Sequence, residues 1–541
     1  MADLTHYNVF EEGKAKFLMP KKNKVFYNNV QQFNRDMSIA AIKTWHHIWS
    51  EEKRQAQLKR IKNKAGKEAQ GKASVEISDG STKAMEVDAQ PVTSDKPTSS
   101  SVAHNKSYTF TILEALAASG IRSLRYALEI PHISKITSND LLEDAVEAIK
   151  QNVEYNGIRQ DLMVPNLGDA IDVMYSHRDP KKRFDVIDID PYGTAVPFLD
   201  GAVQAVADGG LLCITCTDMA ILTGSMHPET CYYKYGAMPV KGMFHHEMGL
   251  RILLQTIANT AAKYSRVITP MLSCSIDFYC RVFVRVHTSA ADAKLNALKM
   301  SHVYQCTRCF SFATQPVGRI VTSAKGGSRH TPNTGPVVGT KCEHCGGSHH
   351  VGGPFWNASL HDNEFVQVMK KEVKDNGTAY GTERRMEGML SVISEELNVP
   401  FYWTLGRLTS RMQCTSIPMT TVFSALLNGG YKASVSHCAA DSVKTDAPAS
   451  VMWDILRAWV KEHPIKQENI RDDSVAKAIL DVSPQFQADF TYHKDAESES
   501  RKQKLVRFQM NPEKNWGPKA RPSSKRSSDD DEEADKKQKT E

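Results

Sequence analysis

Apolar and polar residues alternate in blocks between residues 108 and 287, as in a chain that forms strands and helices in turn. Short apolar runs bounded by turn residues predict strands at Tyr108–Leu113, Ile133–Ser138, Leu162–Val164, Phe184–Ile189 and Leu211–Thr215. Amphipathic stretches predict helices at Ile121–Glu129, Leu142–Asn156, Ala195–Ala207 and Phe244–Tyr264. Strands that alternate with helices in this way form a parallel sheet.

Two later apolar runs, Arg266–Ser273 and Phe278–His287, break this alternation because only a short connection joins them. They predict an antiparallel hairpin next to the parallel strands. Seven strands that end in such a hairpin are more typical of a methyltransferase sheet than of a plain dinucleotide-binding fold. The predicted fold class is therefore α/β, with a Rossmann-like class I methyltransferase sheet.

The regions around this sheet differ in composition. Residues 1–50 form an N-terminal segment that ends in a predicted helix through Ile39, Ile42, Trp45 and Trp49. Large apolar residues are almost absent from 51–106, so this stretch is predicted to be a disordered insertion. The remaining expected units are a catalytic domain at 107–290, a Gly/Ser-rich module at 300–350, a mainly helical C-terminal domain at 351–490 and a disordered charged tail at 491–541.

The overall charge is mildly basic, with 68 Lys and Arg against 62 Asp and Glu, for a net charge of +6. The acidic run Asp529–Glu533 offsets part of the positive charge of the rest. No apolar run is long enough to span a bilayer, and the N-terminus lacks a secretory apolar region. The 11 cysteines are scattered, apart from two Cys-x-x-Cys pairs, which is typical of a reducing compartment. These features predict a soluble intracellular protein with no membrane contact and no evident obligate protein partner.

The segment FDVIDIDPYG, residues 184–193, is a buried strand followed by an acid, a proline, an aromatic residue and a glycine. Pro191 cannot continue a strand ladder and Gly193 permits a sharp turn, so Asp190 and Tyr192 lie at a carboxyl strand end. A carboxylate beside an aromatic ring can hold an exocyclic amine and stack on the base that carries it. The alternative is a simple Asp-Pro turn that closes the strand.

Three features of the preceding strand ends indicate a nucleoside cofactor. Small residues fill the turn from Ala115 to Gly120, which lets backbone amides approach a ligand at a helix start. Asp140 follows the second strand and can accept the two hydroxyls of a ribose. Asp169, followed by Ala170, is placed to contact an adenine amino group. Each acid also has an alternative reading as a helix cap. Together they point to S-adenosylmethionine.

Two pairs of cysteines, Cys306-x-x-Cys309 and Cys342-x-x-Cys345, have the spacing of a structural zinc site. Four thiolates are the simplest ligand set. Histidines 344, 349 and 350 lie nearby and offer replacements for one cysteine. Free buried cysteines are the alternative. Because all four positions would be filled, the expected role of the metal is structural.

The chain resembles the eukaryotic type of the tRNA (guanine(26)-N2)-dimethyltransferase family. The resemblance rests on the segments EGKAKF, VFYNNVQQFNRD, ALAASGIRSLR, DIDPYG, GGPFW and KTDAP. These segments extend from Glu12 to Pro448, apart from the insertion at 51–106. The combination is much more specific than any one of its motifs.

The resemblance implies S-adenosylmethionine-dependent methylation of guanine N2 in tRNA, with dimethylation at position 26. It implies that Arg35 and Arg122 lie at the cofactor and that Phe26 forms part of the wall of the base pocket. Asp190 would hold the amine and Tyr192 would stack on the guanine. Two alternatives stay open. One is a non-catalytic tRNA-binding or tRNA-folding protein on the same scaffold, and the other is a methyltransferase for another tRNA guanine.

Two further regions carry candidate RNA contacts. Tyr232 and Lys234 lie in the polar and aromatic segment 218–241, where they can stack on bases and contact phosphate, or can instead anchor the segment to the core. Arg407, Arg411 and Lys444 suggest phosphate contacts in a C-terminal tRNA-binding domain, with a solvated basic face as the alternative. The tail segments RKQK and KARPSSKR resemble nuclear localisation signals. We therefore expect a nuclear protein, with a mitochondrial pool left open.

Overall fold

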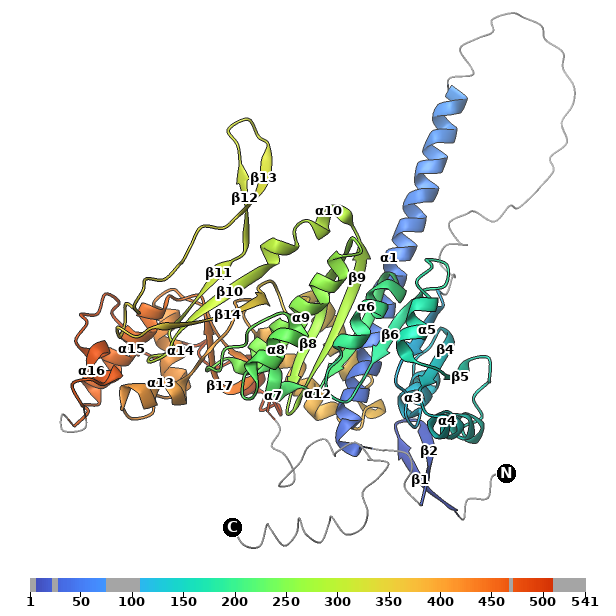
Figure 1. Cartoon of the computed structure of the whole chain (residues 1–541), viewed down its shortest axis with the longest axis horizontal. Helices are drawn as coiled ribbons and strands as arrows, with labels where there is room; N and C mark the ends of the chain where they lie inside the picture. The colour runs from blue at the N-terminus through green and yellow to red at the C-terminus, as the bar shows by residue number, and fades with distance from the viewer. Residues whose placement is uncertain (1–5, 22–27, 74–107, 467–469, 509–541) are drawn as a thin grey trace, which may run out of the picture.

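The computed structural model describes residues 6–21, 28–73, 108–466 and 470–508. At its centre is a seven-stranded sheet with the order β5-β4-β3-β6-β7-β9-β8 (Figure 1). Its strands are β3 (Phe110–Glu114), β4 (Ile133–Asp140), β5 (Met163–Leu167), β6 (Phe184–Ile189), β7 (Val206–Cys216), β8 (Arg266–Ile276) and β9 (Tyr279–Thr288). The first five strands of this order are parallel, whereas β9 is antiparallel to β7 and β8. The predicted sheet with its final hairpin is confirmed.

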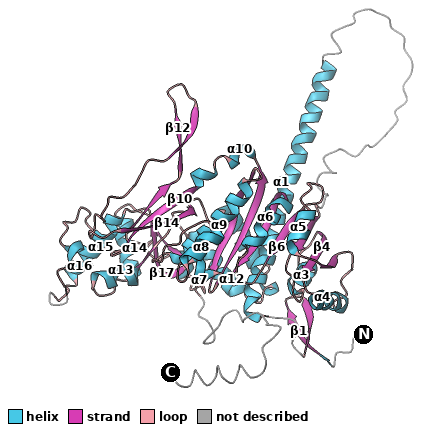
Figure 2. Cartoon of the chain, viewed as in Figure 1, coloured by secondary structure: helices cyan, strands magenta, loops and turns pink. Residues whose placement is uncertain are grey.

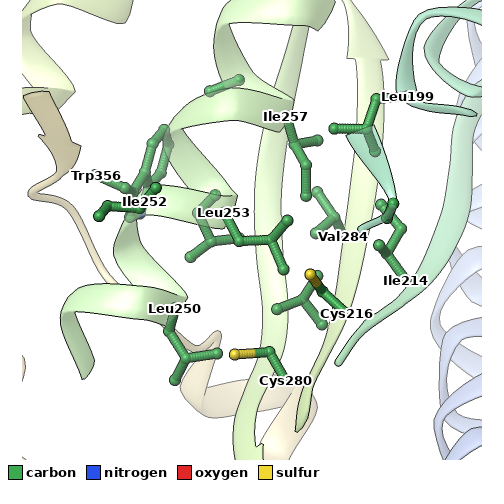
Figure 3. Close-up of a cluster of buried hydrophobic side chains, with 14 of the residues drawn as sticks. Leu199, Ile214, Cys216, Leu250, Ile252, Leu253, Ile257, Cys280, Val284 and Trp356 are labelled. Atoms are coloured by element: carbon green, nitrogen blue, oxygen red, sulfur yellow. The ribbon is translucent and has the colours of Figure 1, made fainter. Parts of the chain in front are cut away.

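Helices cover both faces of the sheet, and the side chains of each strand alternate between the two resulting cores. One core contains α5 (Ala170–Ser176), α6 (Val196–Ala205) and α9 (His245–Ala262). Figure 3 shows part of it, where Leu253 and Ile257 of α9 face Ile214 and Val284 of the sheet. The other core contains α1 (Gln32–Ala73), α3 (Ile121–Glu129), α4 (Glu143–Tyr155), α11 (Asn363–Asp375) and α12 (Glu383–Glu395). A sheet covered on both faces explains the nearly continuous apolar strands.

Helix α1 is longer than predicted, because it continues to Ala73 through residues expected to be disordered. Lys, Glu, Gln and Ala, which fill this stretch, are strong helix formers even where they bury no core. Gln55 donates a hydrogen bond of 2.7 Å to Glu51 one turn earlier, and Glu52 is ion-paired with Arg285 of β9. The prediction was therefore wrong for residues 51–73, and the rest of the expected insertion, 74–106, lies outside the described residues. The predicted helix at Ala195–Ala207 ends earlier, at Ala205, where β7 follows directly.

After β9 the chain forms a small three-stranded sheet with the order β11-β10-β14. Its strands are β10 (Met300–Cys306), β11 (Phe312–Pro316) and β14 (His349–Trp356). Between β11 and β14, the strands β12 (Gly318–Thr322) and β13 (Ser328–Pro332) form a hairpin that projects from the body of the molecule (Figures 1 and 2). The span between the two cysteine pairs therefore loops out, which lets the two pairs come together.

The C-terminal unit combines helices α13 (Leu405–Met412), α14 (Met419–Asn428), α15 (Ala449–Glu462) and α16 (Val475–Leu480) with a second three-stranded sheet. The strands of that sheet are β15 (Trp403–Thr404), β16 (Ala433–Ser436) and β17 (Ala439–Thr445). These helices share one hydrophobic cluster with the four paired cysteines. Helices α11 and α12 instead pack with α1 on the central sheet, so the packing does not follow the domain boundary predicted at residue 351.

Part of the predicted disordered tail is ordered against α12. The short helix α17 (Glu499–Lys502) contains Ser500, whose backbone N–H and hydroxyl donate hydrogen bonds of 2.7 and 2.6 Å to Glu395. The prediction was wrong for residues 491–508, and 509–541 lie outside the described residues. Among the helices that the structure describes, none is both long and apolar enough to cross a membrane.

Candidate active site

The first turns of α1 lie across the carboxyl ends of the central strands. Asn34 donates a hydrogen bond of 3.3 Å to the hydroxyl of Thr215, near the end of β7. Ser38, one turn later, accepts a hydrogen bond of 2.8 Å from Arg281 of β9. The N-terminal segment therefore covers the edge of the sheet where an open α/β fold binds its ligands.

Arg122, in the first turn of α3, joins this helix to the end of β6. Its Nη2 donates to Oδ2 of Asp190, and its Nη1 donates to Ser38 at 3.0 Å and to Asn34 at 3.2 Å. The Arg122 guanidinium is buried, whereas the Asp190 side chain keeps 23% of its surface exposed. In the described part of the chain, the second carboxylate oxygen of Asp190 has no hydrogen-bond partner, so it is available as an acceptor.

Behind Asp190 lies a buried cluster of charged groups. Asp188 accepts hydrogen bonds from Arg281 at 2.6 and 3.1 Å and from the hydroxyl of Tyr126 at 2.6 Å. Burial alone would raise the pKa of Asp188, but Arg281 and Arg122 hold that pKa below its usual value. Asp188 therefore remains ionised in the core and fixes both arginines in place.

Glu114, at the end of β3, is the third carboxyl of this cluster. Complete burial raises the pKa of Glu114 to about 8, against the opposing effects of Arg122 and Ser123. Three carboxyl groups share two guanidinium groups here, so a neutral Glu114 balances the charge. With Glu114 neutral, the cluster holds no excess of buried negative charge.

The turn between β3 and α3 is held in a shape suited to a ligand. The Ala118 N–H donates a hydrogen bond of 2.8 Å to Asp140, whose other oxygen accepts one of 3.0 Å from the Leu142 N–H. Ala118 and Gly120 both have positive φ angles, of 47° and 75°. A Cβ on Gly120 would lie 2.9 Å from a side-chain carbon of Ile149. The close approach of the turn to α4 therefore requires glycine at this position.

Two exposed leucines next to Asp140 were missed by the sequence analysis. Leu141 and Leu142 directly follow this acid and keep 62% and 59% of their surfaces exposed. Paired leucines at the polar junction of a strand and a helix were the available signal, because a surface helix normally starts with polar residues. An apolar surface beside a carboxylate can hold the base and the ribose of a nucleoside.

Asp169 caps helix α5, and its carboxylate accepts a hydrogen bond of 2.7 Å from the Ile171 N–H. The next residue, Ala170, is buried. Asp169 therefore acts as a helix cap, which was the alternative to a cofactor contact. It is nevertheless exposed at the same sheet edge as Asp140.

Of the three remaining residues predicted for the catalytic site, Arg35 is buried, Tyr192 is exposed and Phe26 is not described. Arg35 is buried and donates to both oxygens of Glu12, at 2.6 and 2.5 Å, and to the Asn28 carbonyl at 3.0 Å. Tyr192 keeps 49% of its surface exposed beside Asp190. Phe26 lies outside the described residues. Arg35 therefore fixes the N-terminal segment through Glu12, and a cofactor contact remains a proposal.

The segment after β7 forms the short helices α7 (Met219–Leu222) and α8 (Pro228–Tyr235). On α8, Tyr232 and Tyr233 keep 58% and 73% of their surfaces exposed. Tyr235 is buried, and its hydroxyl donates a hydrogen bond of 2.8 Å to Thr194. Lys234 is paired with Asp218 at 3.0 Å. The segment is therefore anchored to the core through Tyr235, whereas Tyr232 and Tyr233 face solvent and are accessible to RNA.

The prediction that Lys444 contacts phosphate was wrong. Lys444 is buried, and its ammonium group is paired with Glu396 at 2.8 Å and with Glu247 at 3.2 Å. A charge enclosed by two carboxylates is not accessible to an RNA strand. Arg407 and Arg411 are exposed on α13, as phosphate contacts require.

The four paired cysteines come together as one buried cluster. The sulfur atoms of Cys306 and Cys345 lie 3.4 Å apart, and those of Cys309 and Cys342 lie 3.6 Å apart. The four thiols lie within 4.8 Å of one another. Tetrahedral zinc with bonds of about 2.3 Å to sulfur fits between thiolates at these separations. The cluster can therefore hold a zinc ion, and the three nearby histidines are not part of it.

The order of the central sheet, together with acidic residues at its carboxyl edge, defines a class I methyltransferase fold. A model of the N2,N2-dimethylguanosine tRNA methyltransferase family matches residues 6–457. The chain belongs to this family, which confirms the resemblance.

Curated relatives agree over nearly the whole chain. The tRNA (guanine(26)-N(2))-dimethyltransferase of Schizosaccharomyces pombe is 45% identical over 95% of this chain and 92% of its own. The human enzyme of the same name is 44% identical over 95% of this chain and 78% of its own. The structure of Trm1 from Pyrococcus horikoshii with S-adenosyl-L-methionine has a TM-score of 0.62 and is 26% identical, covering 83% of this chain and 99% of that one.

Proposed function

We propose that this protein transfers methyl groups from S-adenosylmethionine to the N2 amine of guanine in tRNA, and that it dimethylates position 26. The observation that supports the proposal is Asp190, which is held by Arg122 at the carboxyl end of β6 and keeps its second oxygen available as an acceptor. The relatives at 45% and 44% identity are named for this reaction, and the similar archaeal structure contains the cofactor.

The turn after β3 and the acid after β4 would hold the cofactor. Asp140 would accept the ribose hydroxyls, which is supported by its position between the turn at Ala118 and the start of α4. Leu141 and Leu142 would cover the adenosine, and Asp169 would contact its amino group at the next strand end. When bound there, S-adenosylmethionine supplies an electrophilic methyl group on sulfur.

Asp190 would act on the attacking amine. The lone pair of guanine N2 is delocalised into the ring, so the amine is a weak nucleophile. A carboxylate that accepts one N–H localises this lone pair and takes the proton as the new nitrogen–carbon bond forms and the sulfur–methyl bond breaks. The Pro191 carbonyl would accept the second N–H. Most of the rate enhancement would come from alignment, since the leaving group is already activated.

Tyr192 would stack on the guanine, for which its exposed ring beside Asp190 is suited. Phe26 would form part of the wall of the base pocket, as the family resemblance implies. A second transfer to the same nitrogen requires a rotated amine and room for one methyl group. Arg122 would position Asp190 in both transfers because it connects that carboxylate to α1.

The four cysteines would bind a structural zinc ion, which would stabilise the small sheet that carries them. Tyr232, Tyr233, Arg407 and Arg411 would contact the tRNA outside the target base, because all four are exposed. Lys234 is paired with Asp218 and would exchange this partner for a phosphate. The name of the Saccharomyces cerevisiae relative, 38% identical, includes the word mitochondrial, and a nuclear location for this protein remains a prediction.

The test is mass spectrometry of nucleosides from tRNA incubated with the protein and labelled cofactor. We expect label in N2-methylated guanosine, and in no other nucleoside. The Asp190→Ala variant should lose this label while it still binds tRNA. Label in a different nucleoside would overturn the specificity, and full methyl transfer by the variant would overturn the assigned site. Binding without methyl transfer by the wild-type protein would favour the non-catalytic alternative.

A further inference from the structure

An open, polar pocket of about 610 Å³ lies between the cysteine cluster and the C-terminal helices. Its walls come from the loop between Cys306 and Cys309, the end of α13 and the segment before α16. Figure 1 shows α13 and α16 at the opposite end of the molecule from α3 and α4. None of the residues that line the pocket belongs to the candidate active site.

Positive charge dominates this pocket, because three arginines line it and Asp473 is the only acid among the lining residues. Arg308 donates to two backbone carbonyls, that of Cys345 at 3.1 Å and that of Asp473. The Arg411 guanidinium lies 4.5 Å from the centre of the Phe310 ring. Within the described part of the chain, no carboxylate is paired with the guanidinium of Arg308 or Arg411. Only Arg471 has such a partner, in an exposed pair with Asp473 at 3.4 Å.

Size and chemistry together indicate the ligand. A volume of about 610 Å³ lies within the range of about 300–1,000 Å³ found for pockets that hold organic ligands. Ser410 and Gln413 add neutral hydrogen-bonding groups to the walls. A guanidinium that already stacks on one aromatic ring offers its other face to a base, and arginine is the preferred partner of phosphate. This combination suits a phosphodiester together with its nucleoside.

We propose that this arginine pocket, formed by Arg308, Arg411 and Arg471, binds the RNA backbone of the substrate at a distance from the target guanine. The proposal rests on the proposed function, since it takes the ligand to be a segment of the tRNA. The pocket supplies affinity and register, whereas the chemistry takes place at Asp190.

The cysteine cluster forms one wall of the pocket. Arg308 lies between Cys306 and Cys309, and its Nη1 donates to the carbonyl of Cys345 in the second pair. A Cβ on Gly347 would lie 2.9 Å from the Cys306 sulfur and 3.1 Å from the Arg308 side chain. Bringing the two cysteine pairs together therefore fixes the position of the Arg308 guanidinium. A metal in the cluster would act on RNA binding through this arginine.

The experiment uses the full-length Arg411→Gln/Arg471→Gln double variant, with Lys461→Gln as the control. Lys461 is an exposed cation of the same C-terminal unit that does not line the pocket. Binding of tRNA is measured by fluorescence anisotropy at several salt concentrations. We expect the Kd of the double variant to rise about 10-fold and its salt slope to fall by about 1 to 2, because each lost phosphate contact removes nearly one unit. The control should change the Kd less than about twofold.

Further measurements separate this proposal from the proposed function. The affinity for the cofactor and the kcat at saturating tRNA should match the wild type, while the KM for tRNA rises. Arg411→Lys should keep the salt slope, since it keeps the charge. If the wild type methylates tRNA and the double variant binds tRNA with unchanged Kd and slope, the pocket does not bind RNA. If inorganic phosphate stabilises the wild type but not the double variant, and both bind tRNA equally well, the pocket is a small-anion site. This outcome also overturns the proposal. Failure of the wild type to methylate tRNA would instead contradict the proposed function.

Discussion

The guanidinium of Arg122 is paired with the carboxylate of Asp190, and the same guanidinium contacts Ser38 of α1. Arg122, in the first turn of α3, thus positions Asp190, which directly follows β6. This pairing leaves the second oxygen of Asp190 available as an acceptor. The orientation of that oxygen therefore depends on Arg122 as well as on the turn that carries Asp190.

Replacement of Arg122 by lysine should lower kcat about 100-fold and leave the affinity for S-adenosylmethionine within a factor of three. A lysine keeps the charge but cannot donate to Asp190, Ser38 and Asn34 at once, and a small displacement of a catalytic group has an effect of about this size. Single-turnover methyl transfer and calorimetric cofactor binding measure the two quantities. The exposed Arg159→Lys variant is the control. A loss of cofactor affinity with unchanged kcat would show that Arg122 serves the cofactor instead.

Glu114 should make stability depend on pH in a way that a glutamine at this position abolishes. Its pKa is about 8 in the folded protein and near 4.5 when exposed, so the folded state retains the proton between these values. The stabilisation is complete below about pH 4.5 and is lost as the pH rises towards about 8, by at most about 1.4 kcal/mol per pH unit. The melting temperature of Glu114→Gln should therefore rise relative to the wild type between pH 5 and 8. For the exposed control Glu143→Gln, the difference in melting temperature from the wild type should not change with pH. A pH-independent difference for Glu114→Gln as well would contradict the raised pKa of Glu114.

The central sheet could be predicted from the sequence because each buried strand is a short apolar run with turn residues at both ends. The length of α1 could not, since residues 51–73 have almost no large apolar side chains and their helix depends on propensity and on pairs such as Glu52 with Arg285. Candidate residues at strand ends were found because the chain order places them there. The burial of Lys444 was hidden, because its partners Glu247 and Glu396 are distant in sequence. Its local pattern is the same as that of an exposed phosphate-binding lysine.

Gly120→Ala should weaken binding of S-adenosylmethionine about 10-fold, which corresponds to about 1.4 kcal/mol. The substitution places a Cβ at a residue with a φ of 75° and 2.9 Å from Ile149, so the turn that approaches the cofactor must move. Gly157→Ala is a matched control, because Gly157 also has a positive φ, of 62°, but no atom lies within 4 Å of its Cβ. Equal effects of the two variants on the cofactor Kd would assign the loss to backbone strain alone.

The cysteine cluster should bind about one zinc ion per chain, and Cys345→Ser should lose it. We expect the fluorescence of Trp453 to change on zinc removal, because its indole N–H donates a hydrogen bond of 2.8 Å to Ser311, beside the first cysteine pair. Metal content is measured by mass spectrometry, and the fluorescence change by addition of a chelator. Cys414→Ser is the control, since this cysteine lies outside the cluster. A full zinc content in Cys345→Ser would contradict the assigned ligands.

Lys444→Met should destabilise the protein by about 3 kcal/mol, because it removes the buried cation that Glu247 and Glu396 share. The cost is at the lower end for a broken buried ion pair, since Glu247 keeps Arg251 and Glu396 keeps His437 as partners. Glu247 belongs to α9 on the central sheet, Glu396 follows α12, and Lys444 lies in β17 of the C-terminal unit. The loss should therefore appear as earlier thermal unfolding, whereas the folded fraction should bind tRNA with the wild-type Kd. The exposed Lys432→Met, just before β16, should have little effect on stability. If Lys444→Met is as stable as the wild type but binds tRNA more weakly, Lys444 contacts phosphate, contrary to its buried ion pairs.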